Sequence, residues 1–179
     1  MPNMYYAEFK THSLSGCSYQ YRHDTRIYLS GFSGNRLGGR CLGAFIGKNP
    51  GSASGLSLGW GRIEEDTTLR LIRSVWLKSM VYNKVQAKAG DYIQILNLFY
   101  LCNPAYGQAV RLANKHALYF PDTAEGQNFE KIWWGIGDYD DAARRLSACL
   151  SRLLSSSIKS CPKHVLSRTR KVGQVASPN

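Results

Sequence analysis

Short apolar runs that lead into Gly or Asn occur three times along the chain. They lie at 42–46, 92–99 and 132–135, within the segments FIGKNPGSA, DYIQILNLFYL and KIWWGIGDYD. In an α/β protein this is the pattern of a buried parallel strand whose carboxyl end opens into a ligand site. The pattern therefore predicts three core strands and places candidate site residues where each strand ends.

Apolar residues at helical spacing predict helices in the rest of the chain. Asp66, a residue type that caps helix N-termini, precedes apolar residues that recur every three or four positions. These residues are Leu69, Ile72, Val75 and Trp76. A loop and a short helix are expected over 104–118, and a further helix over 138–155. The apolar stripe of that further helix is Ala142, Leu146, Cys149, Leu150 and Leu153.

The remaining segments complete a predicted α/β architecture. Residues 19–33 are typical of a short hairpin or edge strands around a polar turn at 22–25, and Ile158 marks a short fourth strand. The Gly-containing stretches 34–40 and 48–65 are expected to be irregular. Because strands alternate with helices, we expect one domain over 1–179, a three-layer α/β/α fold with a central, mainly parallel four-stranded sheet.

The distribution of charge favours a polyanionic partner. The chain of 179 residues has 23 Lys and Arg against 12 Asp and Glu, a net charge of +11. Residues 142–179 hold eight basic residues and no acidic one, whereas residues 1–141 are nearly balanced. Nucleic acid is the partner that such a basic segment favours first. The alternative is a solvated basic tail that only keeps the protein in solution.

Cysteine usage and hydropathy argue against several other classes of protein. The five cysteines are odd in number and form no CxxC pair, so neither a disulfide framework nor a zinc or iron–sulfur site is indicated, and we expect no cofactor. No apolar stretch approaches the roughly 20 residues of a membrane-spanning helix, and the N-terminus lacks the pattern of a secretory signal. A monomer in the cytoplasm, with no membrane partner, is the expectation.

Four segments, in their order along the chain, resemble the uracil-DNA glycosylase superfamily. GKNPG at 47–51 resembles the water-activating loop of its mismatch-specific branch, and ILNLFYL at 95–101 the strand whose Asn reads the flipped pyrimidine. WWGIGD at 133–138 resembles a Leu-Trp-Gly strand end, and CPKHVLSR at 161–168 a late His-Pro-Ser loop. NPGSA, DTTLRLIR and NLF also resemble a bacterial family of unassigned function, a distant relative of these glycosylases. The resemblance implies a glycosylase-like fold that excises a base from DNA.

That resemblance assigns catalytic roles to two residues. Asn49 would hold the water that attacks the sugar, and being neutral it would position this water more than deprotonate it. Asn49 is otherwise simply a turn residue before Pro50. His164 would donate to the base oxygen or bind a phosphate, or it is an ordinary histidine of a basic segment. Asp66 follows the first loop, so it either only caps a helix or also contacts the site.

Further residues are candidates for binding the base and the DNA. Gly47 and Asn97 would contact the base, and a mid-strand Asn is costly unless something, ligand or backbone, satisfies its hydrogen bonds. Trp60 or Phe99 would stack on the base, although large aromatics are more often core residues. The expected DNA contacts are the phosphate-binding Lys48, Lys163, Arg168 and Arg170 and the wedge Leu166, which would fill the vacated stack.

Departures from the superfamily pattern shift the expected substrate away from uracil. Asn49 stands where the most active uracil branch has Asp, and the last loop reads His-Val-Leu in place of His-Pro-Ser. Small residues at 51–61 leave room for a bulky base, so we expect excision of a modified pyrimidine such as the hydroxymethylated or glucosylated cytosine of phage DNA. The alternatives are a non-catalytic DNA-binding protein on the same fold and a hydrolase of free nucleosides or nucleotides.

Overall fold

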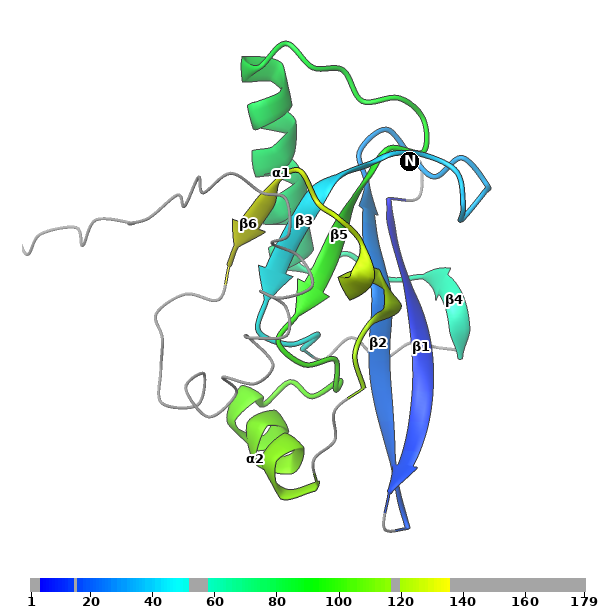
Figure 1. The fold of residues 1–179 in the computed structure, drawn as a ribbon, viewed down its shortest axis with the longest axis vertical. Coiled ribbons are helices and arrows are strands. Elements are labelled where there is room, and N and C mark those ends of the chain that lie inside the picture. The colour runs from blue at the N-terminus through cyan, green and yellow to red at the C-terminus, as the bar shows by residue number, and fades with distance from the viewer. Residues whose placement is uncertain (1–3, 15, 52–57, 117–119, 136–179) are drawn as a thin grey trace, which may run out of the picture.

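The computed structural model describes residues 4–14, 16–51, 58–116 and 120–135, and these residues form one six-stranded mixed sheet (Figure 1). The strand order in the sheet is β4-β1-β2-β5-β3-β6. The strands are β1 Tyr5–Leu14, β2 Cys17–Tyr28, β3 Cys41–Gly47, β4 Gly59–Arg62, β5 Tyr92–Asn97 and β6 Ile132–Trp134. The helices are α1 Thr67–Tyr82, α2 Tyr106–His116 and the short 3-10 helix η1 Thr123–Gly126.

The sheet has a parallel half and an antiparallel half. Strand β3 runs parallel to both of its neighbours, β5 and β6, whereas the pairs β1–β2, β1–β4 and β2–β5 are antiparallel. The arrows of β3, β5 and β6 accordingly point the same way in Figure 1. All six residues of β5 are buried, as expected for an apolar strand covered on both faces. The carboxyl ends of these three strands therefore lie at one end of the sheet.

The expected three-layer fold with a four-stranded, mainly parallel sheet is wrong. The three predicted core strands and the helices at 67–82 and 106–116 are present, and Asp66 caps α1 as predicted. The N-terminal 28 residues, however, contribute two long antiparallel strands, and a further strand forms at 59–62 inside the stretch expected to be irregular. Buried and half-buried residues alternate over 5–9, which is the pattern of an antiparallel strand with one covered face. The helix predicted at 138–155 and the strand predicted at Ile158 lie outside the described residues.

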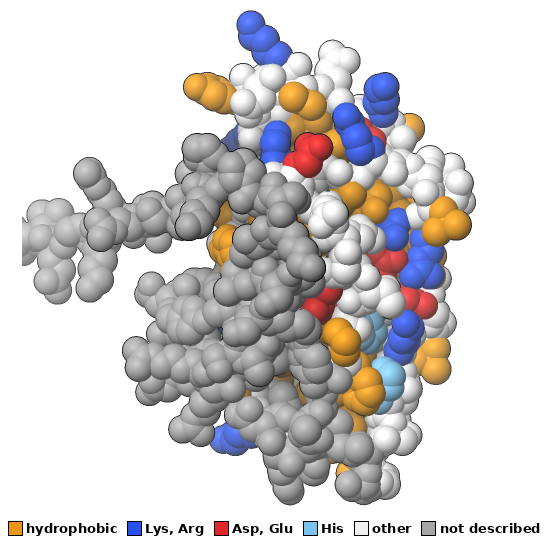
Figure 2. Space-filling view, in the orientation of Figure 1, with side chains coloured by type: hydrophobic (Ala, Val, Ile, Leu, Met, Phe, Trp, Pro, Cys, Tyr) orange, Lys and Arg blue, Asp and Glu red, His pale blue; other side chains and the backbone are white. Residues whose placement is uncertain are grey.

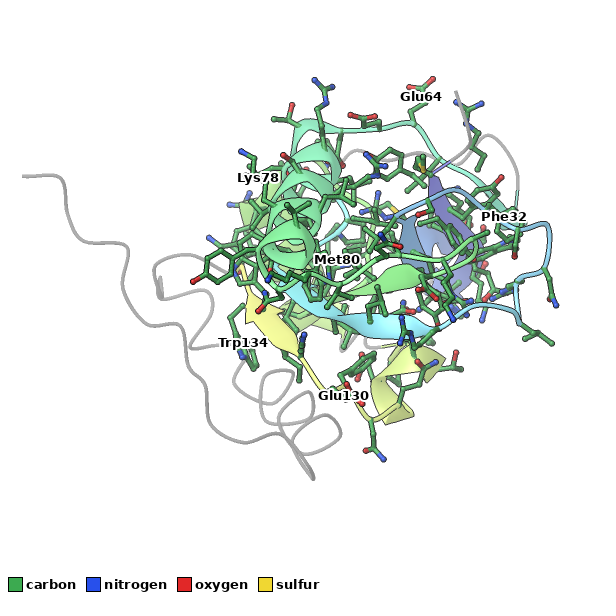
Figure 3. All side chains as sticks on the ribbon, turned by 90° about the horizontal axis from the view of Figure 1, so that it is seen from above. Phe32, Glu64, Lys78, Met80, Glu130 and Trp134 are labelled. Atoms are coloured by element: carbon green, nitrogen blue, oxygen red, sulfur yellow. The ribbon has the colours of Figure 1, made fainter. Side chains whose placement is uncertain are left out.

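Helices pack on opposite faces of the sheet. Leu69, Ile72 and Met80 of α1 pack with the face that carries Ile93 and Ile95, and burial of each such side chain contributes about 1.5 to 3 kcal/mol. The other face packs against α2 and η1 through Leu96, Leu98 and their neighbours. Figure 3 shows α1 and η1 on opposite sides of the sheet, with Met80 directed from α1 toward the strands. Val75, predicted to lie in the apolar stripe of α1, is exposed.

A β-bulge in β2 changes which face its residues point to. Tyr6 pairs with Arg26 but Glu8 pairs with His23, so β2 has one residue more than β1 in this interval. Asp24 lies there with a φ of 40°, a left-handed conformation that is uncommon outside glycine. Such a bulge reverses the alternation of side chains on either side of it. Arg22 consequently points to the face covered by α1.

The side of the molecule shown in Figure 2 has no continuous basic patch among the described residues. Lys and Arg side chains are scattered there among acidic, polar and hydrophobic ones. This fits the near balance of charge over 1–141 and leaves the excess of positive charge with 142–179. Within the described part of the chain, no helix is both long enough and apolar enough to span a membrane.

Candidate functional site

A pocket of about 240 Å³ lies where β3 and β5 end and α1 begins. Five segments that are distant in sequence line it. They contribute Arg22 from β2, Phe45 and 47–51 from β3 and its loop, Asp66, Thr68, Leu69 and Ile72 around the start of α1, Ile95 and Asn97 from β5, and Gly135 after β6. The position agrees with the rule that ligands bind outside the carboxyl ends of parallel strands.

Gly47 and Asn97 are the last pair of the parallel ladder between β3 and β5, and both line the pocket. A Cβ atom on Gly47 would lie 2.9 Å from the side-chain oxygen of Asn97, so only glycine fits without displacing that amide. Asn97 is 3% exposed, and its Nδ2 has no hydrogen-bond partner among the described residues. An unsatisfied buried donor costs about 1 to 3 kcal/mol, which is a reason to expect that a ligand satisfies it.

Asn49 is held in a fixed orientation at the pocket wall. Its Nδ2 donates to the backbone carbonyl of Asn103 at 2.9 Å, and Asn103 is itself held by a bond from the Ala105 amide to its side-chain oxygen at 2.8 Å. Since the nitrogen of the Asn49 amide is used in this way, its oxygen is the atom that remains to accept a hydrogen bond. A side chain so arranged can position a water molecule.

Arg22 is the residue of this pocket that sequence reasoning missed. It is 4% exposed, and its Nε and Nη1 have no hydrogen-bond partner among the described residues. Burial lowers the pKa of its guanidinium, and the charges of Cys102 and Asp66 only partly offset this. The sequence interpretation placed Arg22 in a polar turn, and no local signal distinguishes it there, because the bulge at Asp24 determines where it points.

Asp66 serves both the helix and the pocket. Its Oδ1 accepts a hydrogen bond from the Leu69 amide at 2.7 Å and so caps α1, while the residue also lines the pocket. It acts on Arg22 through space, and the two make no ion pair. One oxygen of the Asp66 carboxylate is therefore committed to the cap, and the residue also lies in the wall of the pocket.

The predicted aromatic base-stacking residues do not lie in the pocket. Trp60 is on β4, three strands away from β5, where its ring lies 4.4 Å from the Arg36 guanidinium and stacks on Tyr6. Phe99 is buried in the core and packs on Tyr106, with 5.8 Å between ring centroids. The aromatic residue of the pocket is instead Phe45, whose position inside a predicted strand gave no sign of this role.

The predicted DNA-binding residues are only partly within the described structure. Lys48 lines the pocket, and its Nζ lies 5.0 Å from the centroid of the Tyr106 ring. The other candidates, Lys163, His164, Leu166, Arg168 and Arg170, lie outside the described residues. The structure thus brings together Gly47, Lys48, Asn49 and Asn97 of the predicted set.

The combination of polar groups and apolar walls in the pocket suits a ligand with a polar ring. Arg22, Asn49 and Asn97 contribute polar groups to its wall, and apolar walls come from Phe45 and the residues of α1. Among the described residues, no group of three or more His, Cys, Asp or Glu side chains is placed to hold a metal ion. Comparisons of the chain with protein-family models, with curated proteins and with solved structures find no match.

Proposed function

We propose that the protein is a monofunctional DNA glycosylase that flips out a modified pyrimidine and hydrolyses its N-glycosidic bond to leave an abasic site. The observation that carries this proposal is the convergence of Gly47, Asn49 and Asn97 on one pocket. Gly47 and Asn49 lie in the segment that resembles the water-holding loop. Asn97 lies in the segment that resembles the base-reading strand. The unpaired buried amide of Asn97 supports a ligand with a matching acceptor.

The geometry supports a division of labour between the two amides. Asn97 would donate from Nδ2 to a carbonyl oxygen of the base, and Asn49 would accept a hydrogen bond from water through its free oxygen. The water oxygen bonds to C1′ of the sugar as the C1′–N1 bond breaks, and the electron pair of that bond leaves with the base. The proton lost by the water passes to solvent, and the base takes up a proton. Because Asn49 is neutral, it orients the water without removing its proton, and slow turnover is expected.

The size of the pocket supports a substituted ring as the substrate. A cavity of about 150 Å³ holds benzene in another protein, so about 240 Å³ has room for a six-membered ring and a substituent. The wall is made in part by Gly47, Gly51 and Gly135, which present no side chain. Hydroxymethylated or glucosylated cytosine in phage DNA, excised in the cytoplasm as a defence, is the substrate that we propose, and the basic segment 142–179 would bind the DNA backbone.

The test is an alkali-cleavage assay on DNA that contains uracil, mismatched thymine, hydroxymethylcytosine or glucosylated hydroxymethylcytosine. The wild-type protein should produce alkali-labile sites on at least one modified cytosine. Asn49→Ala and Asn97→Ala should each lower the rate by about 100-fold or more, the usual effect of removing one positioned polar group. Asn83→Ala is the matched control, because its amide bonds within the last turn of α1 and should leave the rate unchanged.

Binding to DNA without abasic product on every substrate would overturn the proposal in favour of a non-catalytic DNA-binding protein. Equal activity of wild type and Asn49→Ala would instead show that the reaction does not use this pocket as described.

A further inference from the structure

Arg22 is a buried cation whose donors are unused. The residue is 4% exposed, and neither Nε nor Nη1 has a partner among the described residues. A guanidinium is effectively always charged, so it cannot escape the cost of burial by losing its proton. Its side chain lines the pocket beside Asn97, whose Nδ2 is also buried and unpaired. The two residues thus border the same cavity, and both have buried donors without a partner among the described residues.

Several other arginines of the described structure make side-chain hydrogen bonds. The half-buried Arg73 donates to the carbonyl of Leu29, although its Nε is also buried without a partner. Arg26 and Arg36 both pair with Asp24, and Arg40 pairs with Asp91. The carboxylate that acts on Arg22 through space is that of Asp66, but no ion pair joins them and one oxygen of Asp66 caps α1. Arg22 is therefore distinguished by the absence of a partner in the described protein, and a ligand is the simplest source of one.

The conformation that directs Arg22 into the pocket is built by several groups. The amide of Asp24, in the bulge, donates to Oδ2 of Asp122, and the carboxylate of Asp24 accepts bonds from Arg26 and Arg36. Without the bulge, strand alternation would turn Arg22 to the opposite face of the sheet. The bulge therefore serves to place a positive charge in the cavity, and bulges often re-aim side chains beside functional sites.

The shape of the pocket favours a flat anion over a phosphate. Arg22 and Asn97 both line the pocket, whereas Phe45, Leu69 and Ile95 make apolar walls. A phosphate carries oxygens on all sides, and apolar walls would leave several of them unpaired. A planar ring with acceptors along one edge can meet the donors with that edge and the walls with its faces.

We propose that Arg22 and Asn97 form an anion-binding site for a negatively charged pyrimidine. The inference rests on the proposed function in one respect, since there the anion is the departing base. When the C1′–N1 bond breaks, its electron pair stays on the ring and spreads over N1 and the adjacent carbonyl oxygen. Arg22 then faces a charge that is absent from the bound substrate, so its stabilisation acts on the transition state and raises the rate constant of the chemical step.

The test is calorimetric binding of three probes to the full-length protein at about pH 8. The probes are 5-nitrouracil, a pyrimidine acidic enough to be ionised there, thymine, which is neutral, and inorganic phosphate. Wild type should bind 5-nitrouracil about 10- to 100-fold more tightly than thymine, the size of a hydrogen bond to a charged group. Arg22→Gln should abolish this preference and Arg22→Lys should keep part of it. Arg62→Gln, at an exposed arginine of β4, should behave as wild type.

Two results would overturn the inference. One is an unchanged preference for 5-nitrouracil in Arg22→Gln, provided that its thermal unfolding shows a folded protein. The other is phosphate that binds in an Arg22-dependent manner and displaces 5-nitrouracil, which would make the pocket a phosphate site.

The glycosylase assay separates this inference from the proposed function. Arg22-dependent binding of 5-nitrouracil, with no abasic product on any DNA, would support the anion site and contradict the glycosylase. Base excision that proceeds at the wild-type rate in Arg22→Gln would support the glycosylase and contradict the role of Arg22.

Discussion

Arg22 and Arg26 lie four residues apart on the same strand, and both are buried, at 4% and 7% exposure. Arg26 makes two hydrogen bonds to the carboxylate of Asp24, at 2.8 and 3.0 Å, whereas Arg22 has no carboxylate partner in the described structure. Burial lowers the pKa of Arg22 with little compensation. Burial acts in the same direction on Arg26, but the hydrogen bond and charge of Asp24 outweigh it, and its pKa is raised.

The bulge at Asp24 is what makes the two arginines different. In a regular strand, residues four apart share a face, and one extra residue between them puts them on opposite faces. Arg26 lies against the rings of Trp60 and Tyr92, and Arg22 lies in the pocket below α1. Burial of a charged side chain is therefore not by itself a sign of function in this protein. What distinguishes a binding residue from a structural one is whether the fold also provides the counter-charge.

The largest expected effect is on the paired arginine. Asp24→Asn keeps a side chain that tolerates the positive φ but removes the charge that Arg26 and Arg36 share. Because it leaves Arg26 buried without a carboxylate, we expect the free energy of unfolding to fall by about 3 to 5 kcal/mol. Urea unfolding measures this. A loss below about 1 kcal/mol would mean that Arg26 is no better paired than Arg22, and the comparison would fail.

The next effect concerns Asp122, which accepts the hydrogen bond from the bulge. Burial raises the pKa of its carboxyl to about 6 from an ordinary 3.8. Between these values the folded protein binds more protons than the unfolded chain, so stability falls as the pH rises through this window. The side chain of Asp122→Asn does not titrate. The free energy of unfolding of wild type minus that of Asp122→Asn should therefore fall by about 2 kcal/mol from pH 4 to pH 7.

Both proteins in that experiment carry Glu125→Gln, because the charge of Asp122 contributes to the raised pKa of Glu125. Subtracting the variant is then the control for His23, which titrates in both proteins. The pKa values of Glu125 and His23 are displaced by burial to about 7 and about 4, respectively. A difference that stays flat across the window would show that Asp122 does not carry the buried charge next to the bulge.

The smallest expected effect has the opposite sign. Arg22→Met removes a buried charge without a carboxylate partner, so we expect the free energy of unfolding to rise by about 1 to 2 kcal/mol while 5-nitrouracil binding is lost. Arg26→Met, the matched change on the same strand, should lower the free energy of unfolding, because it deprives Asp24 of a partner. Thermal and urea unfolding give both values. A loss of stability in both variants would mean that Arg22 has a structural partner after all.

The parallel half of the fold could be predicted from sequence, and the antiparallel half could not. The apolar runs of β3, β5 and β6, together with Asp66 and the spacing after it, are strong local signals. Strand β4 has two glycines among four residues, a composition that disfavours strands, and it forms because it pairs with Tyr6–Phe9 of β1. The alternation in β1 is a usable local signal for that strand.

The same division holds for the candidate site. Gly47, Asn49 and Asn97 could be placed together because each follows a predicted parallel strand, and such strand ends meet. Arg22 could not be added, because its direction depends on a bulge, and the bulge on a hydrogen bond to a residue 98 positions away. Periodicity reports on neighbours in sequence and carries no information about such a contact.

That long-range hydrogen bond also bears on when the pocket is formed. The β1–β2 hairpin is local and can form early, but Asp122 reaches the ribosome exit long after Asp24, and closing a loop of this length delays the contact. Until it closes, the Asp24 amide lacks its partner, and the extra residue in β2 is held only by the bonds from Arg26 and Arg36 to the Asp24 carboxylate. We therefore expect that in nascent and partly folded chains the Arg22 guanidinium is not yet oriented toward the pocket. Ligand recognition would then be acquired only in the last stage of folding.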